Sequence, residues 1–162
     1  MPSRGASKGR VNSIPPAKIL VGENGEARVC VPIKSSTDIL EARKLGREIA
    51  GEMGFSSMDC TLIATAISEL ARNIVLYAQQ GEIQLCPAVQ TTSTGLNSNG
   101  IVIVAHDEGP GIRDLRSALQ DGFSTSRGLG LGLPGVKRIM DEFDIISKPR
   151  EGTTVTVKKW KP

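Results

Sequence analysis

The glycine-rich stretch 128–135, GLGLGLPG, constrains the fold more than any other segment of the chain. Gly130, Gly132 and Gly135 have the G-x-G-x-x-G spacing that joins a strand to a helix in dinucleotide-binding folds. Here the residues before the glycines, FSTSR, do not form an apolar strand, and only residues 136–162 follow them. These are too few for the rest of a doubly wound sheet, so the stretch indicates another fold.

The same glycines suit a phosphate-binding loop. Glycine lets the backbone approach a ligand closely and turns successive N–H groups toward it. Pro134 is suited to the first turn of the helix that follows, and that helix presents the positive end of its dipole. The alternative for this segment is a flexible surface loop without a ligand.

The periodicity of apolar residues alternates between strand and helix along the rest of the chain. Polar segments with glycine or proline separate the periodic segments. Strands are predicted at 17–22, 26–33, 81–89, 101–107, 143–149 and 152–160, helices at 35–54, 56–78, 113–122 and 133–142, and a polar loop at 90–100. A hairpin turn at Asn24 and Gly25 is predicted to join the first two strands, because both residue types accept a positive φ.

This order of elements predicts an α+β fold. Because the links are short, most neighbouring strands are expected to pair antiparallel, which gives a two-layer sandwich with helices on one face of a mixed, mainly antiparallel sheet. Ile63, Ile67, Leu70 and Ile74 are expected to supply core side chains from the second helix. We expect one domain over residues 17–162, after a flexible basic tail over residues 1–16.

Charge and composition exclude several classes of protein. The net charge of +3 comes from 20 basic and 17 acidic residues, and the first ten residues alone contribute three basic side chains and no acidic one. With so few aromatic residues and no basic cluster in the body of the chain, we expect no nucleic-acid binding. Cys30, Cys60 and Cys86 show no metal-ligand spacing and are expected to be reduced core thiols. We expect no membrane span and a cytoplasmic location, because no apolar run approaches about 20 residues.

Glu69 and Asn73 carry the first candidate chemistry outside the glycine stretch. They stand four residues apart on the predicted helix 56–78 and therefore share one face. A carboxylate and an amide on an otherwise apolar helix are costly to bury without partners, so we expect them to face a polar cleft. The amide oxygen can bind a cation such as Mg²⁺, and the carboxylate can accept a proton from an attacking hydroxyl. The alternative is an ordinary solvated helix face.

Asp107 ends the apolar strand immediately before a turn that contains Gly109 and Gly111. A buried acceptor at this position can take a hydrogen bond from an exocyclic amine, and the glycines would let a flat ring lie against the backbone. The alternative is ordinary turn chemistry, because Asp and Gly are common in turns. His106 should point to the opposite face of the sheet and is interpreted as structural.

Four motifs in order carry a resemblance to a known family. They are E-x-x-x-N (Glu69, Asn73), D-x-G-x-G (Asp107, Gly109, Gly111), G-x-G-x-G-L (Gly128, Gly130, Gly132, Leu133) and a late Gly-Thr (Gly152, Thr153). Together they resemble the GHKL ATPase family, which includes gyrase, the Hsp90 chaperones, histidine kinases and anti-sigma-factor kinases. Within that family, the segments ELARNIVLYAQQGEI and GLGLGLPGVKRIMDEF are most similar to the stand-alone serine/threonine switch kinases of the stressosome, those of the RsbT type.

The resemblance implies ATP and Mg²⁺ as ligands and a role for each motif. Asn73 would bind the Mg²⁺ that bridges the ATP phosphates, and Glu69 would accept the proton of a substrate serine or threonine. The backbone of Gly128, Gly130, Gly132 and Leu133 would surround the phosphates, and residues 113–127 would form a lid over them.

At the other end of the nucleotide, the resemblance implies that Asp107 holds the adenine amino group. Thr153 would support Asp107 through a hydrogen bond or a water molecule. Gly109 and Gly111 belong to the same motif and are counted among the nucleotide-binding residues.

The partners follow from the resemblance alone. It implies phosphorylation of small STAS-domain proteins of the RsbS and RsbR type, and activation of a downstream phosphatase or cyclase-type effector in a partner switch. Two alternatives stay open at this point. One is an anti-sigma-factor kinase that also holds a sigma subunit, and the other is a nucleotide-binding adaptor that transfers no phosphate. Glu69 counts against the adaptor, which has no need of a base beside a metal-binding Asn.

Overall fold

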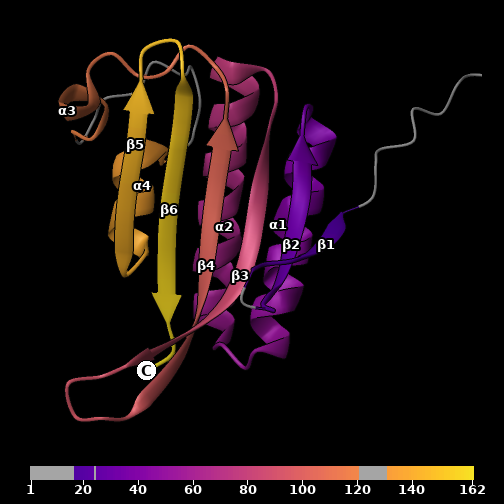
Figure 1. Cartoon of the computed structure of the whole chain (residues 1–162), viewed down its shortest axis with the longest axis vertical. Helices are drawn as coiled ribbons and strands as arrows, with labels where there is room; N and C mark the ends of the chain where they lie inside the picture. Colours follow the sequence, from indigo (N-terminus) through magenta and orange to yellow (C-terminus); the bar gives the residue numbers. More distant parts are fainter. Residues whose placement is uncertain (1–16, 24, 121–130) are drawn as a thin grey trace, which may run out of the picture.

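The computed structural model describes residues 17–23, 25–120 and 131–162. They form a six-stranded sheet in the order β1-β2-β3-β4-β6-β5 (Figure 1). The strands are β1 Lys18–Val21, β2 Ala27–Ile33, β3 Gly81–Thr91, β4 Asn97–Asp107, β5 Glu142–Lys148 and β6 Gly152–Trp160. The predicted α+β fold is confirmed.

Every pair of neighbouring strands within the described sheet is antiparallel. The sheet is therefore antiparallel where a mixed, mainly antiparallel one was expected. Short turns produce the pairs β1–β2, β3–β4 and β5–β6 directly, since a hairpin reverses the chain. The longer connection from β2 to β3 runs through two antiparallel helices and returns the chain beside β2 in the opposite direction.

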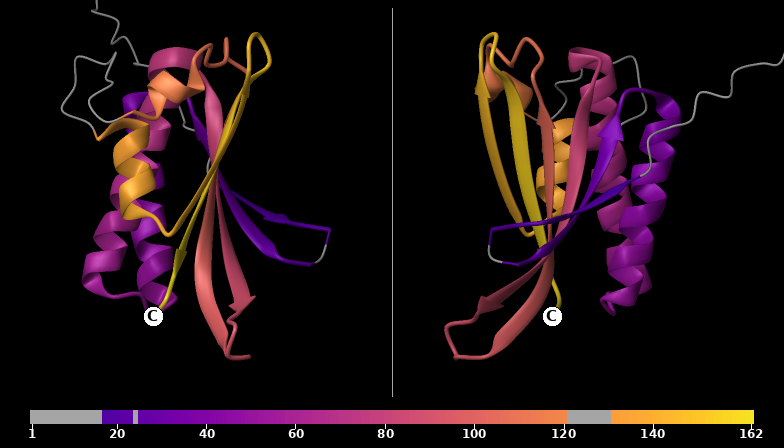
Figure 2. Two further views of the ribbon diagram at one scale, coloured as in Figure 1. Left: turned by 90° about the vertical axis from the view of Figure 1, so that its left-hand side faces the viewer. Right: turned by 45° about the vertical axis from the view of Figure 1, so that its right-hand side comes forward.

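The helices cover one face of this sheet, as Figure 2 shows for the purple and orange helices. They are α1 Ser36–Glu52, α2 Ser57–Asn73, α3 Leu115–Ala118 and α4 Gly132–Ile139, and α2 continues as a π-helical turn, η1 Ile74–Ala78. Helix α1 begins where the carboxylate of Asp38 accepts the backbone N–H of Ser35 at 2.9 Å. It ends before Gly54, which has a φ of +80° that glycine adopts without strain.

Helix α2 supplies the centre of the core. Ile63, Ile67, Leu70 and Ile74 are all buried, as the sequence predicted, and they pack with the inner faces of the strands. By length and composition, Ser57–Ala78 could cross a membrane. In this fold half of the apolar window is buried inside the domain, including Ile63, Ile67, Leu70 and Ile74, and a core helix passes the same test of length and composition.

Several element boundaries differ from the sequence prediction. The predicted polar loop 90–100 is shorter, because β3 extends to Thr91 and β4 begins at Asn97. These residues form a long two-stranded hairpin that extends beyond the other strands (Figures 1 and 2). Backbone pairing between the two arms compensates for their polar composition. Of the helix predicted at 113–122, the described residues 113–120 form only α3, and residues 121 and 122 lie outside the described part of the chain. Helix α4 ends at Ile139 because Met140 already has extended backbone angles.

Candidate active site

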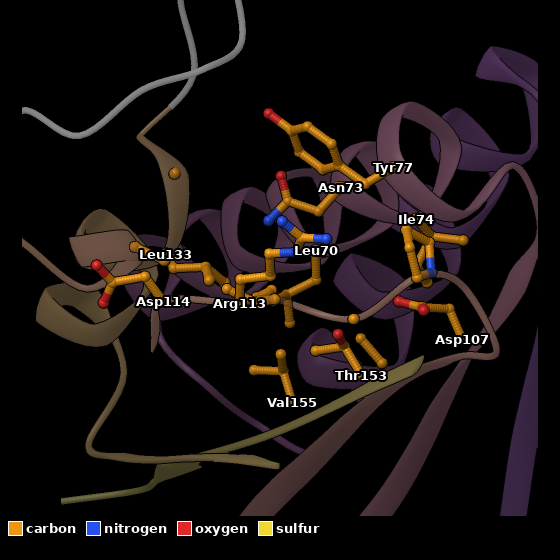
Figure 3. Close-up of a pocket in the computed structure, with 16 residues that line it drawn as sticks. Leu70, Asn73, Ile74, Tyr77, Asp107, Arg113, Asp114, Leu133, Thr153 and Val155 are labelled. Atoms are coloured by element: carbon orange, nitrogen blue, oxygen red, sulfur yellow. The ribbon is translucent and has the colours of Figure 1, made fainter. Parts of the chain in front are cut away.

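A cavity of about 430 Å³ lies between the C-terminal end of α2, the end of β4, the start of β6 and the start of α4. Figure 3 shows the residues that line this cavity and labels ten of them. It is lined by Leu70, Asn73, Ile74, Tyr77, Ala105, Asp107, Pro110, Gly111, Ile112, Arg113, Asp114, Ala118, Gly132, Leu133, Thr153 and Val155. The lining is mostly apolar with a few polar side chains, which is typical of a small-molecule site.

Helix α2 and the π-helical turn form one wall of the cavity. Leu70, Asn73, Ile74 and Tyr77 lie at spacings of three and four residues, so they share one stripe of the helix. Asn73 and Tyr77 lie on the same side of the cavity, across from Thr153 (Figure 3). Tyr77 did not emerge from sequence reasoning, although the helical spacing from Asn73 could have pointed to it.

Asp107 lies at the end of β4 and lines the cavity. Its Oδ1 accepts the backbone N–H of Gly109 at 2.9 Å, which fixes the carboxylate in a turn of ordinary Asx geometry. Among the contacts of the described residues none involves Oδ2, so this oxygen can accept a hydrogen bond from a ligand. The turn interpretation of Asp107 is confirmed, and its role as an acceptor for a ligand stays a prediction.

The two glycines after Asp107 are required by packing within the protein. A Cβ at Gly109 would lie 2.6 Å from the Cβ of Ala78, and one at Gly111 would lie 2.2 Å from the carbonyl oxygen of Lys148. Gly111 also has a φ of +76°. Gly111 lines the cavity, whereas Gly109 lies behind Asp107 against Ala78. Close packing of the chain therefore explains why both positions are glycine, without a ligand ring that lies against the backbone.

Thr153 lies directly opposite Asp107 in the β4–β6 register. Its Oγ1 is 2.8 Å from Oγ of Ser147, and Ser147 in turn accepts the backbone N–H of Ile112 at 2.8 Å. Ser147 therefore ties β5 and β6 to the turn that follows β4. Sequence reasoning missed Ser147, because only the β5–β6 register shows that it pairs with Thr153.

Glu69 is buried beside the cavity and is not among the residues that line it. Only 7% of Glu69 is exposed, and its Oε1 accepts a hydrogen bond from Nη1 of Arg72 at 2.6 Å. Its Oε2 accepts the backbone N–H of Gly132 at 3.3 Å. Glu69 and Asn73 do share one side of α2, but Asn73 reaches the cavity and Glu69 lies under the start of α4.

The start of α4 closes the cavity on the side of the glycine stretch. Gly132 has a φ of +62° and, together with Leu133, lines the cavity. Pro134 follows within the first turn of α4, at the helix end where the dipole favours an anion. Gly128 and Gly130 lie outside the described residues.

Arg113 and Asp114 line the cavity from the segment before α3, and sequence reasoning did not select them individually. Asp114 caps α3 through the backbone N–H of Ser117 at 3.0 Å. Hydrogen bonds from the hydroxyl and the backbone of Ser117 lower the pKa of Asp114, so this residue is a carboxylate at neutral pH. The charges on Arg113 and Asp114 give this side of the cavity a polar rim.

The described residues contain no group of three or more His, Cys, Asp or Glu side chains that could hold a metal ion. Asn73 lines the cavity from α2, and its amide oxygen is an uncharged oxygen donor. Mg²⁺ usually binds to one or two protein oxygens together with substrate phosphates and water. The residues present therefore fit an Mg²⁺ ion that enters with a nucleotide.

Comparison with protein families identifies the family of this chain. The family model of the histidine kinase-, DNA gyrase B- and HSP90-like ATPases matches residues 58–162. The chain belongs to this family. The predicted GHKL membership is confirmed, and membership of this ATPase family implies that the chain binds ATP.

Within the histidine kinase-, DNA gyrase B- and HSP90-like ATPases, the chain is similar to serine/threonine-protein kinase RsbT of Bacillus subtilis (strain 168). The two are 53% identical over 131 residues, which cover 81% of this chain and 95% of RsbT. Anti-sigma F factor of Thermoanaerobacter sp. (strain X514) is 29% identical over 74% of this chain and 82% of its own length. A chain in the crystal structure of the SiaB-SiaC complex from Pseudomonas aeruginosa has a TM-score of 0.47 and 15% identity, over 82% of this chain and 89% of that chain. The predicted relationship to RsbT-type serine/threonine kinases is confirmed.

Proposed function

We propose that this protein is a serine/threonine protein kinase that transfers the γ-phosphate of ATP to a partner protein in a partner switch. The observation that carries the proposal is the placement of Glu69: a buried carboxylate one helical turn before Asn73, which reaches the cavity of an ATPase-family domain. The 53% identity to serine/threonine-protein kinase RsbT supports the same reaction. We assign the kinase domain to residues 17–162, after a segment in which the first ten residues carry three basic side chains and no acidic one.

We assign the nucleotide contacts by their place around the cavity. Asp107 accepts the adenine amino group through Oδ2, and Thr153 supports it from the facing strand. Asn73 binds Mg²⁺ together with the ATP phosphates. The backbone of Gly128, Gly130, Gly132 and Leu133 surrounds those phosphates, as the family resemblance implies.

Glu69 serves as the base in the transfer step. It accepts the proton of the serine or threonine hydroxyl as the hydroxyl oxygen forms a bond to the γ-phosphorus. The bond between the γ-phosphorus and the β–γ bridging oxygen breaks, and ADP leaves with that electron pair. Bound Mg²⁺ would neutralise charge on the phosphates. Because phosphoryl transfer depends mostly on positioning and charge neutralisation, the protein needs no nucleophile of its own.

The proposed acceptors are STAS-domain proteins of the RsbS and RsbR type, and the proposed output is a downstream phosphatase or cyclase-type effector. We place the protein in the cytosol, where thiols stay reduced, because Cys30, Cys60 and Cys86 are all free and buried. A second candidate function is an anti-sigma-factor kinase, which the similarity to anti-sigma F factors favours.

The test is transfer of label from γ-labelled ATP, with Mg²⁺, to a purified STAS-domain protein from the same source. Wild type should label a serine or threonine, and Glu69→Gln should reduce transfer by about 10²-fold or more, the usual contribution of a general base. The affinity for ATP, measured by calorimetry, should be nearly the same in wild type and in Glu69→Gln, because the substitution removes the base and leaves the cavity unchanged. Label at the wild-type rate in Glu69→Gln would refute the assignment. Label on an anti-sigma antagonist alone would favour the second candidate.

A further inference from the structure

Arg72 and Glu69 form an unusual ion pair on α2. The pair is three residues apart, and Nη1 of Arg72 lies 2.6 Å from Oε1 of Glu69. The carboxylate side chain is only 10% exposed, whereas the arginine side chain is 41% exposed. The cation therefore reaches from the surface to a carboxylate that lies inside the protein.

We propose that Arg72 is a positioning residue for the transfer reaction: it holds Oε1 of Glu69 so that Oε2 is presented as the proton acceptor. The proposal rests on the proposed function, in which Glu69 is the base. It adds a residue that belongs to none of the four motifs, and whose side chain is not among the residues that line the cavity.

The two oxygens of Glu69 have different partners, and this difference identifies the reacting atom. Oε1 is held by a short, charge-assisted hydrogen bond from Arg72. Among the described residues, Oε2 has one hydrogen-bond partner, the backbone N–H of Gly132 at 3.3 Å, which is long for a hydrogen bond of this kind. Gly132 itself lines the cavity. Oε2 therefore contacts a residue that lines the cavity, and its weaker hydrogen bond makes it the oxygen that can more easily exchange its partner for a substrate hydroxyl.

An ordinary surface ion pair does not explain this geometry. Lys44 and Glu48 on α1 show what such a pair looks like, with 3.9 Å between the charges and side chains 78% and 55% exposed. Pairs of that kind contribute little, because water solvates both charges. The carboxylate of Glu69 is buried, so its orientation depends on hydrogen bonds from protein groups instead of water. Among its described contacts, the guanidinium of Arg72 is the only charged group.

The first experiment is single-turnover transfer of labelled phosphate from ATP to the purified STAS-domain protein. Arg72→Met should slow transfer by roughly 10- to 100-fold, since a misplaced catalytic group typically costs this much. Its affinity for ATP should stay within about twofold of wild type, because Arg72 does not line the cavity. Arg72→Lys keeps the charge and should recover part of the rate. Lys44→Met, which breaks the exposed pair on α1, is the matched control and should react at the wild-type rate.

The decisive comparison is a double-mutant cycle with Glu69→Gln. If Arg72 acts through the carboxylate, adding Arg72→Met to Glu69→Gln should change the residual transfer rate by less than about twofold. A direct role of Arg72 toward phosphate or partner, or a role in folding alone, would slow the double variant further, and that result would overturn the proposal.

The outcomes also separate this proposal from the proposed function. One outcome is that wild type transfers phosphate, Glu69→Gln does not, and Arg72→Met transfers it at the wild-type rate. This result would support the proposed kinase function and overturn the role of Arg72. Absence of transfer by wild type would overturn both. Thermal unfolding of each variant shows whether a slower rate reflects a loss of folded protein.

Discussion

At the scale of single residues, the polar groups around the cavity are held by protein partners before any ligand arrives. The Asp107 carboxylate is fixed by the N–H of Gly109, and the hydroxyl of Thr153 is fixed by Ser147. Groups that are already oriented lose less conformational freedom when a ligand binds. Ser147 makes three such contacts at once, to the N–H of Ile112, the carbonyl of Gly152 and the hydroxyl of Thr153.

We therefore expect Ser147→Ala to weaken ATP binding without direct contact to the nucleotide. Loss of the hydroxyl leaves the N–H of Ile112 without its partner and releases Thr153, so the free energy of unfolding should fall by about 1–3 kcal/mol. The Kd for ATP, measured by titration calorimetry, should rise roughly 3- to 10-fold, equivalent to one hydrogen bond.

Ser98→Ala is the matched control for Ser147→Ala. Ser98 also makes a part-buried hydrogen bond, from its Oγ to the carbonyl of Lys161 at 2.8 Å, but it does not line the cavity. This variant should lose some stability and keep wild-type ATP affinity. An equal loss of affinity in the two variants would mean that Ser147 acts only through general stability.

At the scale of elements, α2 serves the core and the site at the same time. Ile63 and Ile67 are fully buried, while Glu69 and Asn73 face the start of α4 and the cavity. The helix can do both because its faces repeat every 3.6 residues. Its position is set largely by α1, which approaches it closely at Gly46.

We expect Gly46→Ala and Gly51→Ala, both in α1, to have opposite effects. A Cβ at Gly46 would lie 2.1 Å from Cδ1 of the buried Ile67, so the Ile67 side chain must move within the packed core, at a cost of about 1–3 kcal/mol. A Cβ at Gly51 meets no described heavy atom within 4 Å, so alanine should stabilise the helix by up to about 1 kcal/mol. Urea unfolding measures both changes, and stabilisation by Gly46→Ala would contradict this packing.

At the scale of the whole molecule, the antiparallel sheet brings distant segments to one cavity. Asn73, Asp107, Gly132 and Thr153 come from α2, β4, α4 and β6, and all of them line it. A ligand bound there contacts most elements of the fold, so binding should stabilise the domain as a unit.

We expect Mg²⁺ and ATP together to raise the Tm by roughly 5–10 °C at 100 times the Kd, which corresponds to about 2.7 kcal/mol. Asn73→Ala should reduce this shift to the value seen with ATP and a chelator, because it removes the proposed metal ligand. Asn97→Ala, on the β3–β4 hairpin and away from the cavity, should keep the full shift. An unchanged shift in Asn73→Ala would remove the metal role from this residue.

The sequence alone was sufficient for the fold class, the family and much of the cavity. Periodicity predicted the helix that carries the core, and the motif spacings selected Asn73, Asp107 and Thr153, which the structure brings together. These features are local, because the periodicity of apolar side chains and the short motifs depend on residues that are close in the sequence. The roles of these residues in binding ATP stay predictions.

Tertiary structure alone decided the remaining features. The burial of Glu69 under α4, its pairing with Arg72 and the contact between Ser147 and Thr153 all depend on which segments become neighbours. The extension of β3 and β4 into the polar segment likewise required the partner strand, whose backbone hydrogen bonds outweigh weak strand propensity. Strand register and side-chain burial depend on contacts between elements, so the residue pattern of a single element does not predict them.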